Sequence, residues 1–178
     1  YCLDPKKNYY YDDLITEHID DYGIIGSRMG GVNKKSDKWI GHKDAKSIKR
    51  DLGKKLFNEY LKFCVIRNPY DKMVSLYFLK NKDKNMSFKE FALKNSCNNL
   101  NKHCIDSKSV CDYFIRFEHL EEDIKTLCEK LEIKSYDLSL LPNHKSTYRV
   151  NKQHWSHYYD EETKKIVYNN HKEEFELF

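Results

Sequence analysis

The chain has 178 residues, of which 39% are hydrophobic and 14% aromatic, and its 32 basic and 28 acidic residues give a net charge of +4. This length fits one domain, and the apolar content is sufficient for a core, which excludes a globally disordered chain. The small excess of positive charge suits an anionic ligand but falls short of a nucleic-acid-binding signature. We therefore expect a single domain over residues 1–178 that does not bind nucleic acid.

The sequence shows no clear features of a membrane-spanning segment or of a metal site. The sequence has no apolar run near the roughly 20 residues that a membrane-spanning helix needs, and no visible signal peptide. The expectation is a soluble domain, cytoplasmic if the source is bacterial or viral. The six cysteines include no CxxC pair, so no metal site is expected. The sequence leaves open whether a disulfide forms among three cysteines of a polar connecting segment: Cys97, Cys104 and Cys111.

The first third of the chain predicts short elements. Residues 1–37 are polar and aromatic, interrupted by glycines, with one short helical pattern over residues 12–19. A short strand is predicted over residues 38–41. A helix over residues 44–52 follows, and Gly53 ends it. One or two further helical turns are predicted over residues 56–60.

The clearest strand candidate is LKFCVIR, residues 61–67, a short and mostly apolar run typical of a buried parallel strand. Asn68 and Pro69 come next, and these residue types favour the cap and the first position of a helix. The sequence therefore predicts a helix over residues 69–79. Ser87 caps another helix that runs to about Lys94.

The second half continues the alternation of strands and helices. YFIRF, residues 113–117, predicts a strand, and residues 120–131 predict an amphipathic helix with one apolar face. A loop is expected over residues 141–153, and Asp160 caps a last helix that runs to about residue 174. This order predicts an α/β fold with a parallel sheet flanked by helices.

The segment FCVIRNPYDKMVSLY, residues 63–77, carries the strongest chemical signal. Arg67 stands at the carboxyl end of the strand, where ligands bind in open α/β sheets, and just ahead of a helix start, which favours anions. Its guanidinium suits phosphate, and Ser75 offers a hydroxyl donor. Arg67 and Ser75 would close on one phosphate if the arginine folds back across the helix. The alternative is an ion pair between Arg67 and Asp71, with Ser75 solvated.

RNPYDKMVSLY resembles the 3′-phosphate-binding motif RNPxDRxVSxY of sulfotransferases that use 3′-phosphoadenosine 5′-phosphosulfate (PAPS), with Lys72 where arginine is common. FIRFEHLEEDIKTLCEKLEI and the C-terminal segment from residue 141 resemble two further parts of that family. The resemblance covers roughly residues 38–178 and is closest to carbohydrate sulfotransferases. It implies a P-loop NTPase-like sheet flanked by helices, PAPS as co-substrate without a metal, and a hydroxyl acceptor, expected to be a carbohydrate. Arg67 and Ser75 match the two 3′-phosphate ligands.

The resemblance also implies a catalytic base. Gly41 and His42 follow the short strand KWIG, and carbohydrate sulfotransferases with a Gly-His pair at this position use that histidine as the base. His42 is therefore the expected catalytic base, on the same sheet edge as Arg67, and His144 is the second choice. A surface or packing role is the alternative for any lone histidine.

The loop over residues 143–149 combines cations and hydroxyls, which suit phosphate or sulfate. Its match to the late cofactor-binding loop of the family implies that Lys145, Ser146 and Arg149 also bind the cofactor. A polar surface loop is the alternative interpretation.

One part of the family pattern is missing from the sequence. Family members open with a strand and a glycine-rich loop of the type PKTGGTS, whose amides wrap the 5′-phosphosulfate. Such a loop either lies upstream of Tyr1, which we favour because the other site elements are intact, or is absent from the protein. The first case predicts a sulfotransferase. The second predicts an inactive module that binds an adenosine bisphosphate or an anionic glycan. Another P-loop phosphotransferase is disfavoured because GxxxxGK[ST] does not occur.

Overall fold

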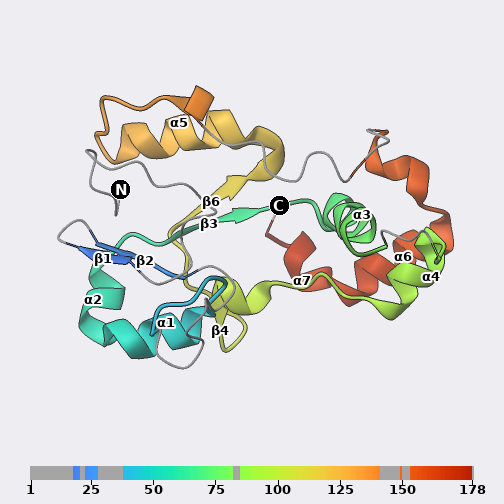
Figure 1. Ribbon diagram of the computed structural model, residues 1–178, viewed down its shortest axis with the longest axis horizontal. Coiled ribbons are helices and arrows are strands. Elements are labelled where there is room, and N and C mark those ends of the chain that lie inside the picture. Colours follow the sequence, from blue (N-terminus) through green and yellow to red (C-terminus); the bar gives the residue numbers. More distant parts are fainter. Residues whose placement is uncertain are drawn as a thin grey trace. The chain divides into compact units, whose positions relative to one another are not determined.

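A computed structural model describes residues 18–20, 23–27, 38–81, 85–140, 149 and 153–177 (Figure 1). The chain divides into two compact units, which are taken separately below. The first unit comprises residues 1–60 and 101–108, and the second comprises residues 61–100 and 109–178. The expectation that residues 1–178 form a single domain stays a prediction. Within the described ranges, no helix has the length and apolar character needed to cross a bilayer.

The first unit contains an antiparallel hairpin of β1 (His18–Asp20) and β2 (Gly23–Ile25). The predicted helix over residues 12–19 is therefore wrong at its end, while residues 12–17 lie outside the described residues. The β-branched side chains explain the difference, because Ile19 pairs directly with Ile24 across the hairpin, an arrangement that favours strands.

The predicted strand over residues 38–41 forms only as a single parallel bridge between Ser27 and Ile40. Ser27 donates its N–H to the carbonyl of Trp39 at 2.8 Å and accepts from the N–H of Gly41 at 2.6 Å. Gly26 permits this close approach, because a Cβ there would lie 3.0 Å from the carbonyl carbon of Ile40. The bridge places His42 in the turn that follows.

Two helices follow in the first unit. α1 (Ala45–Leu52) begins after Asp44, whose carboxylate accepts the N–H of Ser47 at 2.8 Å. It ends at Gly53, whose φ of 83° belongs to the left-handed region that glycine tolerates. α2 (Lys54–Glu59) follows directly. Both ends of α1 confirm the prediction. β4 (Cys104–Ile105) and β5 (Lys108–Ser109) form a further small hairpin, in a segment that the sequence suggested was only a polar connection.

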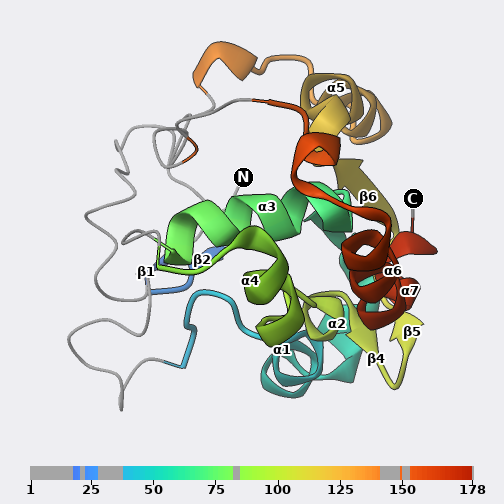
Figure 2. The same cartoon turned by 90° about the vertical axis from the view of Figure 1, so that its right-hand side faces the viewer.

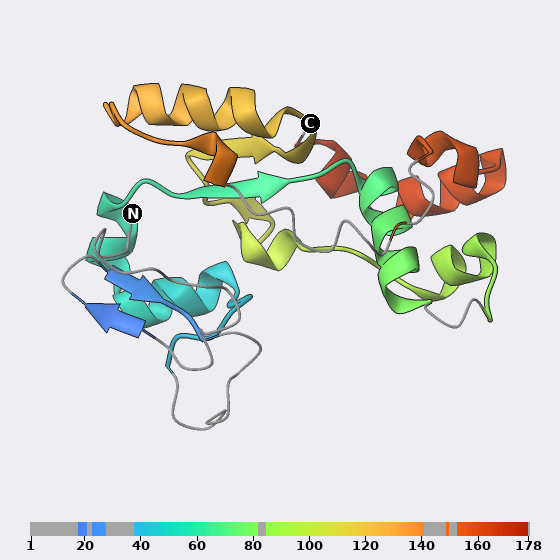
Figure 3. The same cartoon turned by 45° about the horizontal axis from the view of Figure 1, so that its top comes forward.

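The second unit is built on a parallel pair of strands, β3 (Phe63–Ile66) and β6 (Tyr113–Arg116), which lie in register from Phe63 opposite Tyr113 to Ile66 opposite Arg116. α5 (Leu120–Lys130) packs beside β6 and is orange in Figure 3. The carboxylate of Asp123 binds this helix to the strand, because it accepts from the N–H of Arg116 at 2.7 Å and from its guanidinium at 2.7 Å. The predicted parallel sheet flanked by helices is thereby confirmed in a small, two-stranded form. β3 is not the buried strand that the sequence predicts, because Phe63 is 52% and Val65 is 53% exposed.

Helices form the core of the second unit. α3 (Pro69–Lys80), α4 (Phe88–Lys94) and α6 (Glu161–Asn170) pack against one another (Figure 2) around Met73, Val74 and Val167. Their starts follow the predicted caps. The short helical segments η3 (Phe117–His119), η4 (Leu138–Leu140) and η5 (Trp155–Tyr158) also belong to this unit. η2 (Leu100–Lys102) spans the boundary between the two units in the sequence.

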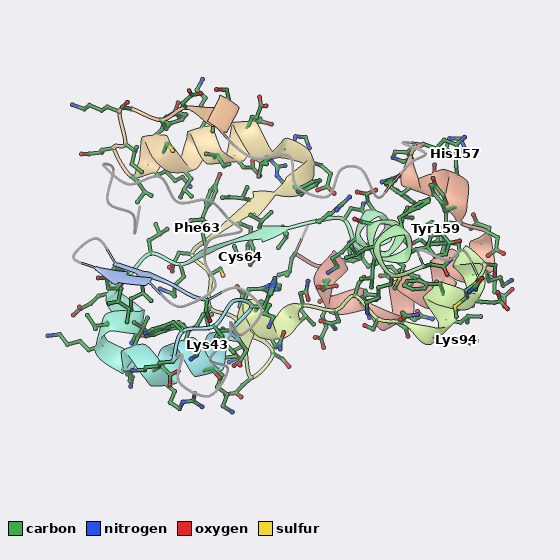
Figure 4. The ribbon with its side chains drawn as sticks, viewed as in Figure 1. Lys43, Phe63, Cys64, Lys94, His157 and Tyr159 are labelled. Carbon is green, nitrogen blue, oxygen red and sulfur yellow. The ribbon has the colours of Figure 1, made fainter. Side chains whose placement is uncertain are left out.

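Tyr159 joins the helices of this core (Figure 4). Its ring lies 5.1 Å from that of Tyr70 and 4.8 Å from that of Phe88, and its hydroxyl donates to the carbonyl of Tyr70 at 2.9 Å. Burial raises the pKa of Tyr159, so the hydroxyl stays protonated and holds the first turn of α3 in place.

The last helix differs from its prediction. The sequence predicts one helix from residue 160 to about residue 174, whereas α6 ends at Asn170 and α7 (Lys172–Phe175) begins after His171. The break has a tertiary cause, because the His171 side chain is fully buried and its Nδ1 lies 3.1 Å from the carboxylate of Glu174.

Candidate functional site

A pocket of about 360 Å³ lies along one side of α3 in the second unit. Four polar side chains line it from the strand–helix segment: Arg67, Lys72, Ser75 and Lys80. Leu76 and Leu79 add apolar surface, and residues 96–99 form a second wall. Arg67 and Ser75, which the sequence singled out, therefore face the same pocket.

Arg67 folds back across the start of α3, as its joint use with Ser75 requires. It donates from Nε and Nη2 to one carboxylate oxygen of Asp71, at 2.8 and 2.5 Å. Its guanidinium also lies 4.4 Å from the centre of the Phe117 ring, a favourable cation–π distance. These hydrogen bonds leave Nη1 without an acceptor among the described residues. The ion pair and the pocket position thus occur together rather than as alternatives.

Asp71 holds a second arginine. Arg149 donates from Nη1 to the other oxygen of Asp71 at 2.7 Å, and from Nη2 to the carbonyl of Gln153. Burial by itself would raise the pKa of Asp71, but hydrogen bonds and positive charge from Arg149 and Arg67 outweigh burial and lower it. We call these three residues the Asp71 network. Two cations share one carboxylate in it, so one positive charge has no carboxylate partner among the described residues.

The Asp71 network also contains an unsatisfied donor. Nε of Arg149 is buried and has no acceptor in the part of the chain that the structure describes. Such a donor is costly unless an anion or another acceptor satisfies it. The predicted partners of Arg149 in the late loop, Lys145 and Ser146, lie outside the described residues, as does His144.

A second set of contacts, which we call the Glu174 network, is buried beside the pocket. Lys72 Nζ lies 2.6 Å from Oε1 of Glu174, and His171 Nδ1 lies 3.1 Å from Oε2. Cys97 Sγ lies 3.7 Å from His171 Nε2. Burial would raise the pKa of Glu174, but hydrogen bonds from His171, Lys72 and the Asn99 N–H lower it to about 2. Lys72 is therefore neutralised where Arg67 is not.

Sequence reasoning missed this second network. Its four residues come from three separate segments, and Lys72 and Glu174 are 102 positions apart. The only local signal was the spacing of His171 and Glu174, which places both on one side of a helical turn. Cys97 was assigned to a polar connection, yet its side chain is buried. All five described cysteines are free thiols, so no disulfide joins Cys97, Cys104 and Cys111.

Side chains of the protein already cap the N-terminus of α3. The side chain of Asn68 accepts the N–H of Tyr70 at 2.9 Å, and the N–H of Asn68 donates to the carboxylate of Glu118 at 2.9 Å. The pocket therefore lies along the flank of the helix and presents side-chain donors. Its positive character comes mainly from the arginine and the lysines rather than from backbone amides.

His42 belongs to the first unit. It is exposed, has a positive φ of 62°, and its carbonyl accepts from Lys102 Nζ. Its imidazole has no hydrogen-bond partner among the described residues, and its role as the base stays a prediction. Arg67 belongs to the second unit, so the shared sheet edge of His42 and Arg67 stays a prediction.

Comparison with known proteins gives two matches. A family model described as "Sulfotransferase family" matches residues 27–178. An uncharacterized protein of Archaeoglobus fulgidus is 39% identical over 93 residues, which cover 47% of this chain and 78% of that protein. No solved structure matches the chain.

Proposed function

The chain belongs to the sulfotransferase family, and from that premise we propose that it transfers a sulfuryl group from PAPS to a hydroxyl group, with a carbohydrate as the acceptor. The P-loop NTPase-like fold implied by the motif resemblance is part of this proposal. The parallel pairing of β3 (Phe63–Ile66) with β6 (Tyr113–Arg116) supports it.

The observation that carries the proposal is the position of Arg67 and Ser75 in one pocket. Eight positions separate these residues in the sequence, and a 3′-phosphate site needs both donors directed at the same place. A guanidinium already fixed by Asp71 loses little conformational freedom when it binds a phosphate. None of the described residues that line the pocket is acidic, which favours an anionic ligand there.

The residues present fit a bisphosphate nucleotide. Nη1 of Arg67 and the hydroxyl of Ser75, which both belong to residues that line the pocket, would hold the 3′-phosphate. We assign Lys145, Ser146 and Arg149 to the same nucleotide. When bound, PAPS supplies the sulfuryl group, and adenosine 3′,5′-bisphosphate is the product that leaves.

The chain's own residues have distinct tasks in the proposed reaction. Asp71 orients Arg67, and Arg67 with Ser75 fixes the nucleotide. His42 would take the proton of the acceptor hydroxyl as that oxygen bonds to the sulfur of PAPS, while the bond from sulfur to the 5′-phosphate oxygen breaks and adenosine 3′,5′-bisphosphate leaves. His42 has no assigned contact with the phosphates, so binding and proton transfer should be separable by mutation.

A second function, nucleotide binding without catalysis, has one observation in its favour. The sequence contains no PKTGGTS-type loop, whereas the residues assigned to the 3′-phosphate are complete. A degenerate domain of this kind would bind adenosine 3′,5′-bisphosphate, or an anionic glycan, without transferring sulfate.

The test is sulfate transfer from radiolabelled PAPS to a panel of glycans by the full-length protein. Labelled glycan that requires both PAPS and Arg67 supports the sulfotransferase. Nucleotide binding without transfer to any acceptor on the panel supports the binding module and contradicts the enzyme.

A further inference from the structure

Glu174 contacts both walls of the pocket at once. One wall is the flank of α3, and the other consists of residues 96–99. Oε1 of Glu174 accepts from Lys72 Nζ at 2.6 Å, on the first wall, and from the N–H of Asn99 at 2.9 Å, on the second. Its other oxygen faces His171 at 3.1 Å. A single carboxylate of α7 thus bridges two segments, which also meet where Cys97 Sγ lies 3.9 Å from the carbonyl of Pro69.

The burial of this carboxylate makes its three contacts necessary. Glu174 is 4% exposed, and an isolated buried carboxylate is very unfavourable. Its charge is compensated only because Lys72, Asn99 and His171 converge on it. Removing one partner of such a buried pair costs more than removing a surface contact. The pair is therefore expected to resist distortion of the pocket.

Cys97, His171 and Glu174 also resemble, in composition, a thiol nucleophile with its base and orienting acid. The surroundings argue against that activity. Burial raises the pKa of the Cys97 thiol to about 11, which keeps it protonated. The N–H of Asn99, a neighbouring candidate to stabilise an oxyanion, already donates to Glu174. These residues are better explained as a brace for the pocket.

We propose that Glu174 is a positioning residue that fixes the spacing of the two pocket walls and the direction of Lys72, so that α7 (Lys172–Phe175) controls nucleotide affinity. This inference rests on the proposed function, because the nucleotide is the ligand whose affinity is controlled. Glu174 itself is absent from the residues that line the pocket and therefore acts through its partners.

Cys97 provides a reporter of wall position that needs no ligand. It lies in the wall of residues 96–99 and is 8% exposed, whereas Cys128 on α5 (Leu120–Lys130) is also 8% exposed but lies outside the pocket. If Glu174 holds the wall, its loss should expose Cys97 and leave Cys128 protected. Unfolding of the whole chain would expose both.

The experiment measures iodoacetamide labelling of each cysteine by peptide mass spectrometry, together with binding of adenosine 3′,5′-bisphosphate by calorimetry. We expect Glu174→Ala to raise the labelling rate of Cys97 about tenfold with Cys128 unchanged, and to weaken binding about tenfold. Glu174→Gln keeps an acceptor of the same length and should recover most of both. Glu173→Ala, which removes the exposed neighbouring carboxylate of α7, is the matched control and should change neither.

The outcomes separate the two proposals. Unchanged Cys97 labelling in Glu174→Ala overturns the positioning role whether or not nucleotide binds, as does nucleotide affinity equal to or above wild type. Faster labelling without any nucleotide binding by the wild type overturns the proposed function, and with it the control of affinity. If Glu174→Ala exposes both cysteines, the glutamine variant decides: preserved labelling and affinity support the role, and weakened affinity with intact folding contradicts it.

Discussion

Asp71 and Lys72 are neighbours on α3, yet they belong to networks with different balances of charge, one positive and one neutral. In the Asp71 network, one carboxylate holds two arginines, and positive charge is left over. In the Glu174 network, one buried carboxylate neutralises one lysine. The comparison teaches that a basic residue near a pocket is available to an anion only where its own counter-ion is shared. On this account the Asp71 network binds the phosphate, and the Glu174 network holds the pocket in shape.

The largest effect is expected outside both networks. If the two networks only bind the nucleotide and hold the pocket in shape, proton transfer needs a separate group. His42→Ala should therefore lower turnover by about 10²–10⁴-fold, the usual contribution of a general base. Sulfate transfer from labelled PAPS measures it. Nucleotide affinity should stay near wild type in the same variant. Near-normal turnover would contradict the role of His42 and direct attention to His144.

The second-largest effect is expected from loss of Arg67, which Asp71 orients, and it should weaken nucleotide binding. Arg67→Ala loses a charge-assisted contact of about 1.5–3 kcal/mol, so affinity for adenosine 3′,5′-bisphosphate should fall roughly ten- to a hundredfold. Calorimetry measures it. Arg116→Ala is the control, because Arg116 also pairs with a carboxylate, Asp123, but does not line the pocket. An equal loss in both variants would show that the effect is only structural.

The Glu174 network should be visible in acid stability. The pKa of Glu174 is lowered from 4.5 to about 2 in the folded protein, so the unfolded state binds a proton first as the pH falls. Its stabilising contribution is therefore complete above pH 4.5 and is lost as the pH falls towards 2. The loss is on the order of 3 kcal/mol.

Urea denaturation at a series of pH values measures this dependence. Glu174→Gln should flatten the slope between pH 4.5 and 2, whereas Glu173→Gln, at an exposed position, should leave it unchanged. If the unfolding free energy depends on pH equally in the wild type and in Glu174→Gln, Glu174 contributes no pH-dependent stability.

Ser75→Ala should give the smallest effect. A neutral hydroxyl donor contributes about 0.5–1.5 kcal/mol, so the affinity for adenosine 3′,5′-bisphosphate should fall by roughly two- to tenfold. The same calorimetric titration measures it, and Ser87→Ala at the cap of α4 serves as a control away from the pocket. A loss as large as that of Arg67→Ala would argue that the hydroxyl, rather than the uncompensated charge, dominates the site.

Local signals predicted much of the fold. Asn68 and Pro69 fixed the start of α3, and Ser87 and Asp160 marked two further helix starts that the structure confirms. The strand candidates around Phe63 and Tyr113 pair in parallel as expected. Each of these features depends on residues adjacent in the chain, where capping and periodicity act.

The same local sequence patterns could not predict the contacts between distant segments. The joining of Lys72 to Glu174 depends on how α7 packs against α3, which no local pattern encodes. The break at His171 has the same origin, because a buried side chain rather than a glycine or a proline ends α6. Arg67 and Ser75 were predictable because both lie on one strand–helix segment. The residues that hold the pocket in shape come from distant segments.

Nucleotide selectivity tests the central claim most directly. Calorimetry on the full-length protein should compare adenosine 3′,5′-bisphosphate with adenosine 5′-monophosphate, which differ only in the 3′-phosphate. A site built on the uncompensated charge of Arg67 should bind the bisphosphate at least about tenfold more tightly, and Arg67→Ala should remove that preference. Equal affinity for the two nucleotides in the wild type would contradict a 3′-phosphate site in this pocket.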